Sequence, residues 1–127
     1  MANVFASGKI VCMSTRSKED ALKATRRFAH LISKYVDPLV RVCNFRISNL
    51  VYSGSVGKCL PLNTLYSRFD KCIYEPTIFP GMKIPIPLEN CNKNVIALIF
   101  HTGKIIITGA KNEEDVHFGY KYILSKI

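Results

Sequence analysis

Residues 94–111, NVIALIFHTGKIIITGAK, predict two β-strands joined by a hairpin turn at Gly103. A strand that faces water on one side usually alternates apolar with polar residues. In the first of these two strands, both the odd-numbered residues 95–99 and the even-numbered residues 96–100 are apolar. One set belongs in a hydrophobic core. The other set requires either a second covering layer or a binding partner.

The composition suits one compact globular protein with an excess of positive charge. The 127 residues are 48% hydrophobic, and 18 Lys and Arg against 9 Asp and Glu give a net charge of +9. Such a charge favours a polyanionic partner. The alternative, a basic surface that only keeps the chain soluble, stays open on charge alone.

The sequence shows no pattern typical of a catalytic or metal site. The 5 cysteines include no C-x-x-C pair and the 3 histidines are scattered, so we expect reduced thiols in an intracellular chain and no metal. Nucleophile–base motifs and a glycine-rich phosphate loop are also missing from the sequence, which predicts a protein that is not an enzyme and has no cofactor. The apolar runs are too short to span a membrane, so no membrane association is expected.

An internal repeat links the two ends of the sequence. A shift of 95 residues places Phe5 on Phe100 and aligns FASGKIV with FHTGKII in one frame. The same shift aligns Arg16 with Lys111 and the acidic pair at 19–20 with the pair at 114–115. Each copy predicts a strand, a turn containing glycine, a second strand and the start of a helix.

Two long helices are predicted from capping residues and apolar stripes. Ser17 and Asn112 are N-cap residues, each followed three residues later by an aspartate. The predicted helices are 18–35, with the stripe Ala21, Ala24, Phe28, Ile32 and Tyr35, and 113 to the end, with the stripe Val116, Tyr120, Ile123 and Ile127.

The predicted strands give an α+β protein in which the helices cover one face of an antiparallel sheet. The prolines at 85 and 87 are expected to break the connection between residues 79 and 100. A second covering layer over the other face is the simpler structural alternative to a binding surface. The predicted strands are 42–52, 77–86, 94–101 and 104–109, with an earlier hairpin around Gly8 and a short helix within 60–69 entered at Pro61.

Four segments, FASGKIV, NFRISNLVYSG, YEPTIFPG and LIFHTGKIIITGAK, closely resemble the core domain of the TATA-box-binding protein family in order and approximate spacing. The resemblance implies a saddle of two repeats, each a curved antiparallel sheet with helices on its convex face. It assigns residues 42–127 to one complete repeat and residues 1–41 to the C-terminal part of the preceding repeat. The start of that repeat is expected about 50 residues before Met1.

The resemblance also implies roles for individual residues on a concave face that binds the DNA minor groove. Phe79 and Phe100 resemble the pair of wedges that kink the duplex, and Asn49 resembles the asparagine that bonds base edges. The other groove-facing positions are Phe5, Val11, Val51, Ile96, Leu98, Ile106 and Thr108. The positions matching phosphate contacts are Lys9, Arg16, Lys104 and Lys111, and the candidate partner-binding residues are Glu75, Lys23, Arg26 and Arg27.

We therefore expect a general transcription factor that binds the minor groove of A·T-rich promoter DNA and kinks it to nucleate transcription initiation. The implied partners are double-stranded DNA, a transcription factor IIB-like protein and other initiation proteins. The expected location is the nucleus, or the cytoplasmic site of transcription if the chain is viral or prokaryotic. The alternative is an interaction-only module that binds transcription proteins without bending DNA. Self-association of the chain is a further expected property, because residues 1–16 would leave sheet edges uncovered.

Overall fold

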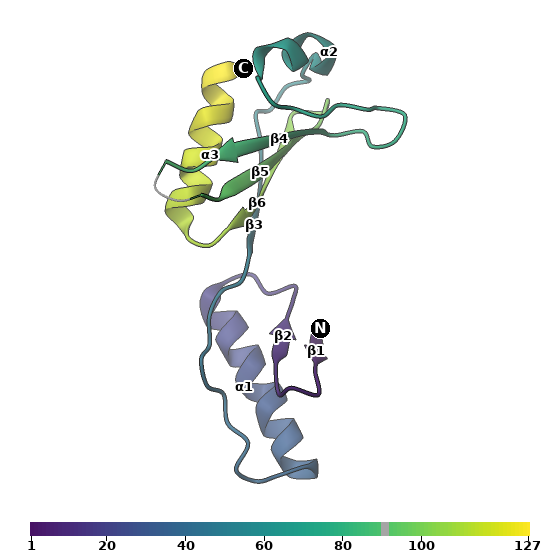
Figure 1. Cartoon of the computed structure of the whole chain (residues 1–127). Helices are drawn as coiled ribbons and strands as arrows, with labels where there is room; N and C mark the ends of the chain where they lie inside the picture. Colours follow the sequence, from purple (N-terminus) through teal and green to yellow (C-terminus); the bar gives the residue numbers. More distant parts are fainter. Residues whose placement is uncertain (90–91) are drawn as a thin grey trace. The chain divides into compact units, whose positions relative to one another are not determined.

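The computed structural model of the chain describes residues 1–89 and 92–127, which form two compact units (Figure 1). The first unit is Met1–Ile47 and the second is Ser48–Ile127. The first contains β1 (Ala2–Val4), β2 (Ile10–Cys12) and α1 (Lys18–Tyr35). The second contains β3 (Leu50–Ser55), α2 (Leu62–Leu65), the 3-10 helix η1 (Tyr66–Arg68), β4 (Met82–Pro87), β5 (Asn94–Ile99), β6 (Lys104–Ala110) and α3 (Glu113–Lys126).

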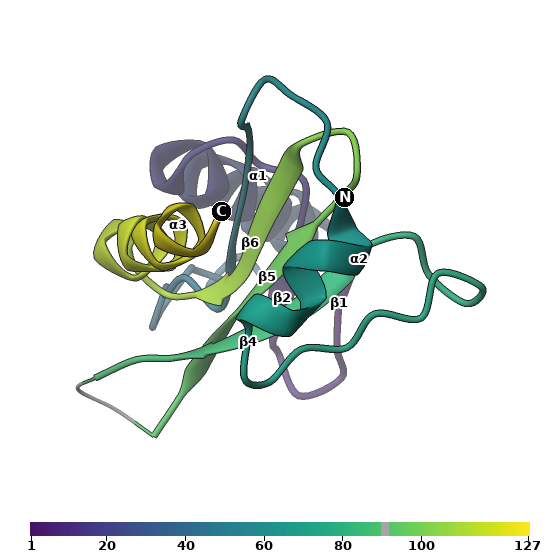
Figure 2. The ribbon, with the colours of Figure 1, turned by 90° about the horizontal axis from the view of Figure 1, so that it is seen from above.

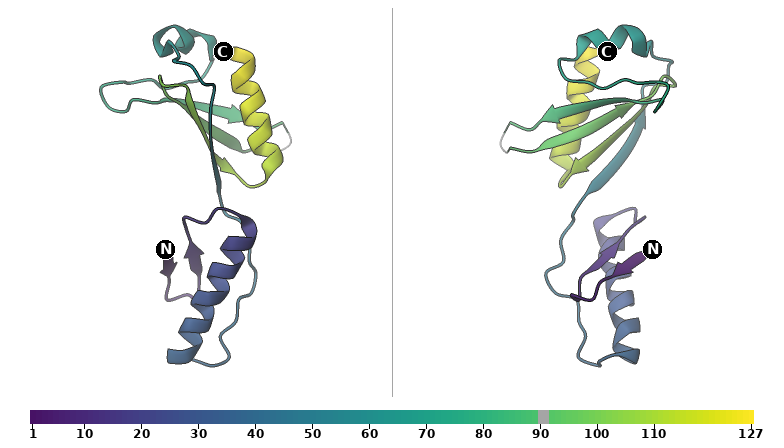
Figure 3. Two further views of the ribbon diagram at one scale, coloured as in Figure 1. Left: turned by 180° about the vertical axis from the view of Figure 1, so that it is seen from behind. Right: turned by 45° about the vertical axis from the view of Figure 1, so that its right-hand side comes forward.

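The first unit is an antiparallel hairpin packed on one helix. Gly8, at φ +88, lies in the turn and donates its N–H to the carbonyl of Phe5 at 2.9 Å. The predicted helix 18–35 is confirmed, and Ser17 caps it by accepting the N–H of Asp20 at 3.1 Å. The predicted stripe was wrong at Tyr35, which is 82% exposed. Tyr35 is the last residue of α1, and this end of the helix extends past the short hairpin (Figure 3).

The second unit is a four-stranded antiparallel sheet with the order β3-β6-β5-β4. α3 packs on β5 and β6, and α2 contributes to the same core (Figures 2 and 3). Arg68 of η1 donates to the carbonyl oxygen of Lys126 at 3.2 Å, which ties η1 to the end of α3. The predicted α+β class is therefore confirmed, with helices on one face of an antiparallel sheet.

α3 begins and packs as its sequence predicts. Asn112 caps it by accepting the N–H of Asp115 at 2.9 Å. Gly119 lies directly on the sheet, where a Cβ would be 3.3 Å from Ile107 Cδ1 and 3.5 Å from Val95 Cγ2. The small residue therefore lets the helix backbone approach the strands closely. The predicted stripe is confirmed by its two fully buried members, Val116 and Ile123, and by the half-buried Tyr120 and Ile127.

Two predicted strands start later than expected. Residues 42–49 are irregular, and the strand begins at Leu50, which pairs with Ala110, the last residue of β6. Residues 75–79 form a turn in which Phe79 donates its N–H to the carbonyl of Glu75 at 2.9 Å. β4 consequently starts at Met82 instead of residue 77.

The prediction that Pro85 and Pro87 break the connection between residues 79 and 100 was wrong, because both lie in β4, which pairs with β5 from Met82 to Pro87. Lys83 exchanges two backbone hydrogen bonds of 2.9 Å with Ile73 on the outer side of β4. Alternate residues of a strand direct their N–H groups the same way, so the nitrogens of both prolines also point away from β5. Neither proline therefore removes a hydrogen bond from the β4–β5 ladder.

Candidate nucleic-acid interface

The β5–β6 hairpin presents two different faces. On β5, Val95, Ala97 and Ile99 are 0% exposed beneath α3, whereas Ile96 and Leu98 between them are only half-buried. β6 repeats this alternation, since its residues 105 and 107 are buried and its residues 106 and 108 are half-buried. We call the side away from α3 the open face; it is formed by Val51, Ser53, Ile96, Leu98, Phe100, Ile106 and Thr108.

The strand register brings these residues into rows across the sheet. Leu98 of β5 is opposite Ile106 of β6, which is in turn opposite Ser53 of β3. Ile96 is likewise opposite Thr108. Residues directly opposite each other in antiparallel strands place their side chains on one face, so the predicted groove-facing residues of β5 and β6 form one continuous surface.

Val51 joins this surface through an irregular part of β3. The register between β3 and β6 shifts between Leu50 and Tyr52, and Tyr52 is opposite the buried Ile107. The Tyr52 hydroxyl donates to Glu113 Oε1 at 3.3 Å on the α3 side. The pKa of Tyr52 is raised, mainly because the hydroxyl loses contact with water and secondly because of the negative charge of Glu113. Val51 therefore lies on the other side, where it is 63% exposed.

Asn49 lies at the edge of the open face and is held by β6. Its Oδ1 accepts the N–H of Gly109 at 2.7 Å, and its Nδ2 donates to Thr108 Oγ1 at 3.3 Å. A side-chain amide carries a second N–H and a further acceptor lone pair. Asn49 is thus positioned by the protein while keeping hydrogen-bonding capacity for a ligand.

Phe79 and Phe100 form an aromatic pair at one end of the open face. Their ring centroids are 5.8 Å apart at an interplanar angle of 68°, which is an edge-to-face arrangement. A Cβ on Gly81 would lie 2.7 Å from Phe79 Cε1 and 3.0 Å from Phe100 Cε1, so glycine is needed for both rings to occupy these positions. Phe79 is 44% exposed although it is aromatic.

The charge on this sheet has one sign. The four strands contain no Asp or Glu, and their only basic residues are Lys83 and Lys104. Lys104 is opposite Ser55 and shares the strand parity of Ile106, which places it on the open face. Lys111 follows β6 directly and is exposed. The open face is thus apolar at its centre, with lysines at its margin.

The first-unit candidates lie on and after the hairpin. Phe5 is 49% exposed at the β1–β2 turn, and its N–H donates to the carbonyl of Lys9 at 2.9 Å. Val11 is half-buried in β2, while Lys9 and Arg16 are exposed. A shared surface between these four residues and the open face stays a prediction.

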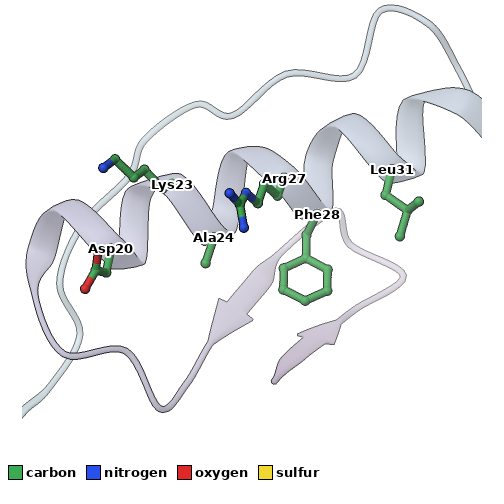
Figure 4. A pocket seen from close by; sticks show the side chains of 6 residues that line it. All are labelled: Asp20, Lys23, Ala24, Arg27, Phe28 and Leu31. Carbon is green, nitrogen blue, oxygen red and sulfur yellow. The ribbon is translucent and has the colours of Figure 1, made fainter.

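The candidate partner-binding residues lie in two separate places. Lys23, Arg26 and Arg27 are exposed on α1. Lys23 and Arg27 border a hollow with Asp20, Ala24, Phe28 and Leu31, and Phe28 points from the helix toward the hairpin (Figure 4). Glu75 is exposed in the turn that leads to Phe79.

Comparison with known proteins identifies the family. A family described as Transcription factor TFIID (or TATA-binding protein, TBP) has a sequence model that matches residues 1–35 and 44–127. The chain belongs to this family. The resemblance drawn from four short segments is thereby confirmed over most of the sequence.

Relatives in eukaryotes and archaea match almost the whole chain. TATA-box-binding protein 2 of Entamoeba histolytica is 38% identical over 123 residues, covering 96% of this chain and 56% of that protein. The TATA-box-binding protein of Tetrahymena thermophila is 39% identical over 123 residues, covering 96% of this chain and 48% of that protein. The chain therefore spans about half the length of these curated relatives.

A solved structure supports the fold. The structure named Methanococcus jannaschii TBP matches with a TM-score of 0.77 at 32% identity, covering 98% of this chain and 69% of that chain. The TBP-like α+β fold expected from the resemblance is confirmed, whereas the division into one complete and one partial repeat stays a prediction. The family is named for a transcription factor and not for a reaction, which agrees with the expectation that this TBP-family chain is not an enzyme.

Three residues of the open side were missed by sequence reasoning. Ser53 and Lys83 face the same side as Leu98 and Ile106 through the register of β3 and β4. The period of two in the predicted strand 77–86 could have placed Lys83 there. Ile73 extends the same row through its bridge to Lys83, and nothing in the loop sequence around it indicates a strand.

Metal and membrane sites find no support in residues 1–89 and 92–127. No group of three or more His, Cys, Asp and Glu side chains in these two ranges could hold a metal ion. None of the helices in the same ranges combines the length and hydrophobicity needed to cross a bilayer. Cys91, one of the cysteines considered above, lies outside the described residues.

Proposed function

We propose that the chain binds the minor groove of A·T-rich duplex DNA through its open face and acts in transcription initiation. One observation carries the proposal: an apolar strip centred on Leu98 and Ile106 contains no carboxylate and has Lys104 at its margin. Phosphates flank a groove whose floor is made of base edges. An apolar centre with cationic margins is complementary to that arrangement.

The preference for A·T pairs follows from which base-pair edges can lie against the apolar centre without losing hydrogen bonds. In the minor groove, A·T and T·A pairs display only acceptors, whereas a G·C pair adds the N2 amine of guanine. Leu98 and Ile106 carry no acceptor, so this amine would lose its hydrogen bonds to water without replacement. The free amide N–H of Asn49 can donate to an adenine N3 or thymine O2 at the edge of the contact.

The proposed kink uses the ring pair at the end of the face. Phe79 and Phe100 approach from one side, so both rings can enter the same base step. Unstacking a step costs a few kcal/mol and is offset by the larger apolar surface that a bent minor groove covers. This exchange is cheapest at flexible TA steps.

The remaining assignments extend the same proposal. The second unit acts as one complete repeat and the first as the C-terminal part of another, with Phe5 and Val11 adding groove contacts and Lys9, Arg16, Lys104 and Lys111 binding phosphates. A transcription factor IIB-like protein contacts the Glu75 turn, and other initiation proteins contact Lys23, Arg26 and Arg27. The protein acts in the nucleus, or at the cytoplasmic site of transcription if the chain is viral or prokaryotic.

An interaction-only module is the second candidate function. The hollow on α1 is bordered by Lys23 and Arg27 against one acidic residue, Asp20, and Leu31, which also lines it, is 51% exposed. This excess of positive charge favours an acidic protein partner. In that case α1 mediates the contact and the open face does not bend DNA.

Competition among three duplexes tests the proposal. Inosine lacks the N2 amine of guanine, so an I·C pair presents an A·T-like minor groove and a G·C-like major groove. Replacing A·T by I·C in the target should retain binding, while G·C should weaken it by roughly 1–3 kcal/mol for each pair changed. Equal affinity for all three duplexes, or loss of binding with I·C, would contradict minor-groove readout.

A further inference from the structure

We infer that Lys83 contacts a DNA phosphate beside the open face, as a further binding residue on β4. This inference rests on the proposed function and extends the contact surface by one strand. Lys83 is opposite Leu98, which is opposite Ile106. The lysine thus continues the central row of the open face onto the outer strand.

The burial of its neighbours determines which way Lys83 points. Met82 and Ile84 are 0% and 1% exposed, with their side chains in the core beneath the helices. Successive side chains of a strand point to opposite faces. Lys83 itself is exposed, so its side chain lies on the open side.

The backbone of Lys83 is fixed on both sides while its side chain is free. Pairing with β5 holds one side of the residue, and the two 2.9 Å hydrogen bonds with Ile73 hold the other. A lysine normally extends its apolar stem along the surface and keeps its ammonium group in water. The four strands of the sheet contain no acidic residue, and Glu75, two residues beyond the bridged Ile73, is the acidic residue that the paired segment brings nearest to Lys83.

The spacing of the strands places this charge where a groove wall would be. β4 is an outer strand of the sheet, about 4.8 Å beyond the strand that carries Leu98. Lys83 therefore lies at the margin of the apolar centre. Phosphates flank the groove floor, so a lysine at this margin gains a phosphate partner.

The test is the salt dependence of binding to an A·T-rich duplex. Lys83→Ala should reduce the slope of log K against log salt by about 0.9, the contribution of one phosphate contact. Lys83→Arg, which keeps the charge, should retain the wild-type slope. Lys121→Ala is the matched control, because Lys121 is exposed on α3 at the opposite face of the sheet and should leave the slope unchanged.

The outcomes separate this inference from the proposed function. Salt-dependent binding by the wild type with an unchanged slope in Lys83→Ala would overturn the inference and leave the proposed function standing. Failure of the wild type to bind would remove both. Thermal melting of Lys83→Ala should match the wild type, since the residue is exposed. Equal slope changes in Lys83→Ala and Lys121→Ala would show a net-charge effect and would also overturn the inference.

Discussion

Replacing Gly81 by alanine should disturb the proposed wedge without unfolding the protein. The new Cβ would lie 2.7 Å from Phe79 Cε1, and ordinary contact begins at 3.4 Å, so the Phe79 ring must retreat by roughly 0.7 Å. Phe79 is 44% exposed and has room to move outward. The change adds one methyl group and keeps both aromatic residues.

Two small terms determine the stability of this variant. Loss of the edge-to-face pair costs about 0.5–1.5 kcal/mol. The reduced freedom of the unfolded chain on changing glycine to alanine offsets about 0.4–1 kcal/mol of that loss. The free energy of unfolding should therefore fall by no more than about 1 kcal/mol, which thermal denaturation would show as a shift of a few degrees.

DNA binding should respond more strongly than stability. Stacking of an aromatic side chain on a base contributes about 1–3 kcal/mol, so a displaced wedge should weaken binding by roughly 5- to 150-fold. Energy transfer between dyes at the ends of an A·T-rich duplex should also report a smaller bend. Gly119→Ala places the same methyl group on the opposite face and should leave the bend unchanged. Wild-type bend and affinity in Gly81→Ala would refute the wedge, as would a loss of stability above about 3 kcal/mol, which would make the rings core residues.

Three further predictions concern the fold and its two faces. Gly103→Ala should lower the free energy of unfolding in urea by about 2 kcal/mol or more, because φ is +90 and the new Cβ would overlap a backbone carbonyl oxygen; a wild-type denaturation midpoint would contradict this. Ile107→Ala should cost about 2–5 kcal/mol by opening a cavity under α3, whereas Ile106→Ala should cost less than half as much and weaken DNA binding instead; the reverse order of stabilities would exclude our assignment of the faces. Amide hydrogens of α1 should exchange with solvent sooner than those of β5 and β6, because Ala21 and Ala29 are its only buried apolar residues; slower exchange in α1 would contradict this reasoning.

The helices and the hairpin could be predicted because local chemistry specifies them. Ser17 and Asn112 each accept the backbone N–H three residues later, as predicted for N-caps. Gly103 provides the positive φ that the β5–β6 turn requires. The alternation of burial along β5 and β6 was not visible in the sequence, because both sets of residues are apolar; packing against α3 decides which set is buried.

The outer strands could not be predicted as well, because their limits depend on pairing. β3 begins at Leu50, opposite the last residue of β6, and the sequence of β3 alone does not specify where its partner strand ends. The prolines of β4 are tolerated because the bonds between Lys83 and Ile73 point their nitrogens outward. The direction of the proline nitrogens follows from how β4 pairs with its neighbours and not from the amino-acid composition of the strand.

The candidate site was only partly accessible from periodicity. The two-residue period of a strand assigns Leu98 and Ile106 to one face. The contact of Phe79 with Phe100 joins a turn to the end of a strand, and no sequence period predicts such a contact. Family resemblance supplied that pair. Lys83 matches none of the phosphate-contact positions that the resemblance implies, although strand parity alone places it on the open side.

Methyl chemical shifts on addition of an A·T-rich duplex test the central claim most directly, because adjacent residues of one strand lie on opposite faces. We predict that Ile96, Leu98 and Ile106 shift on binding, whereas the buried methyl groups of Ile99 and Ile105 change little. Shifts confined to α1, or equal shifts for both sets, would contradict DNA binding by the open face.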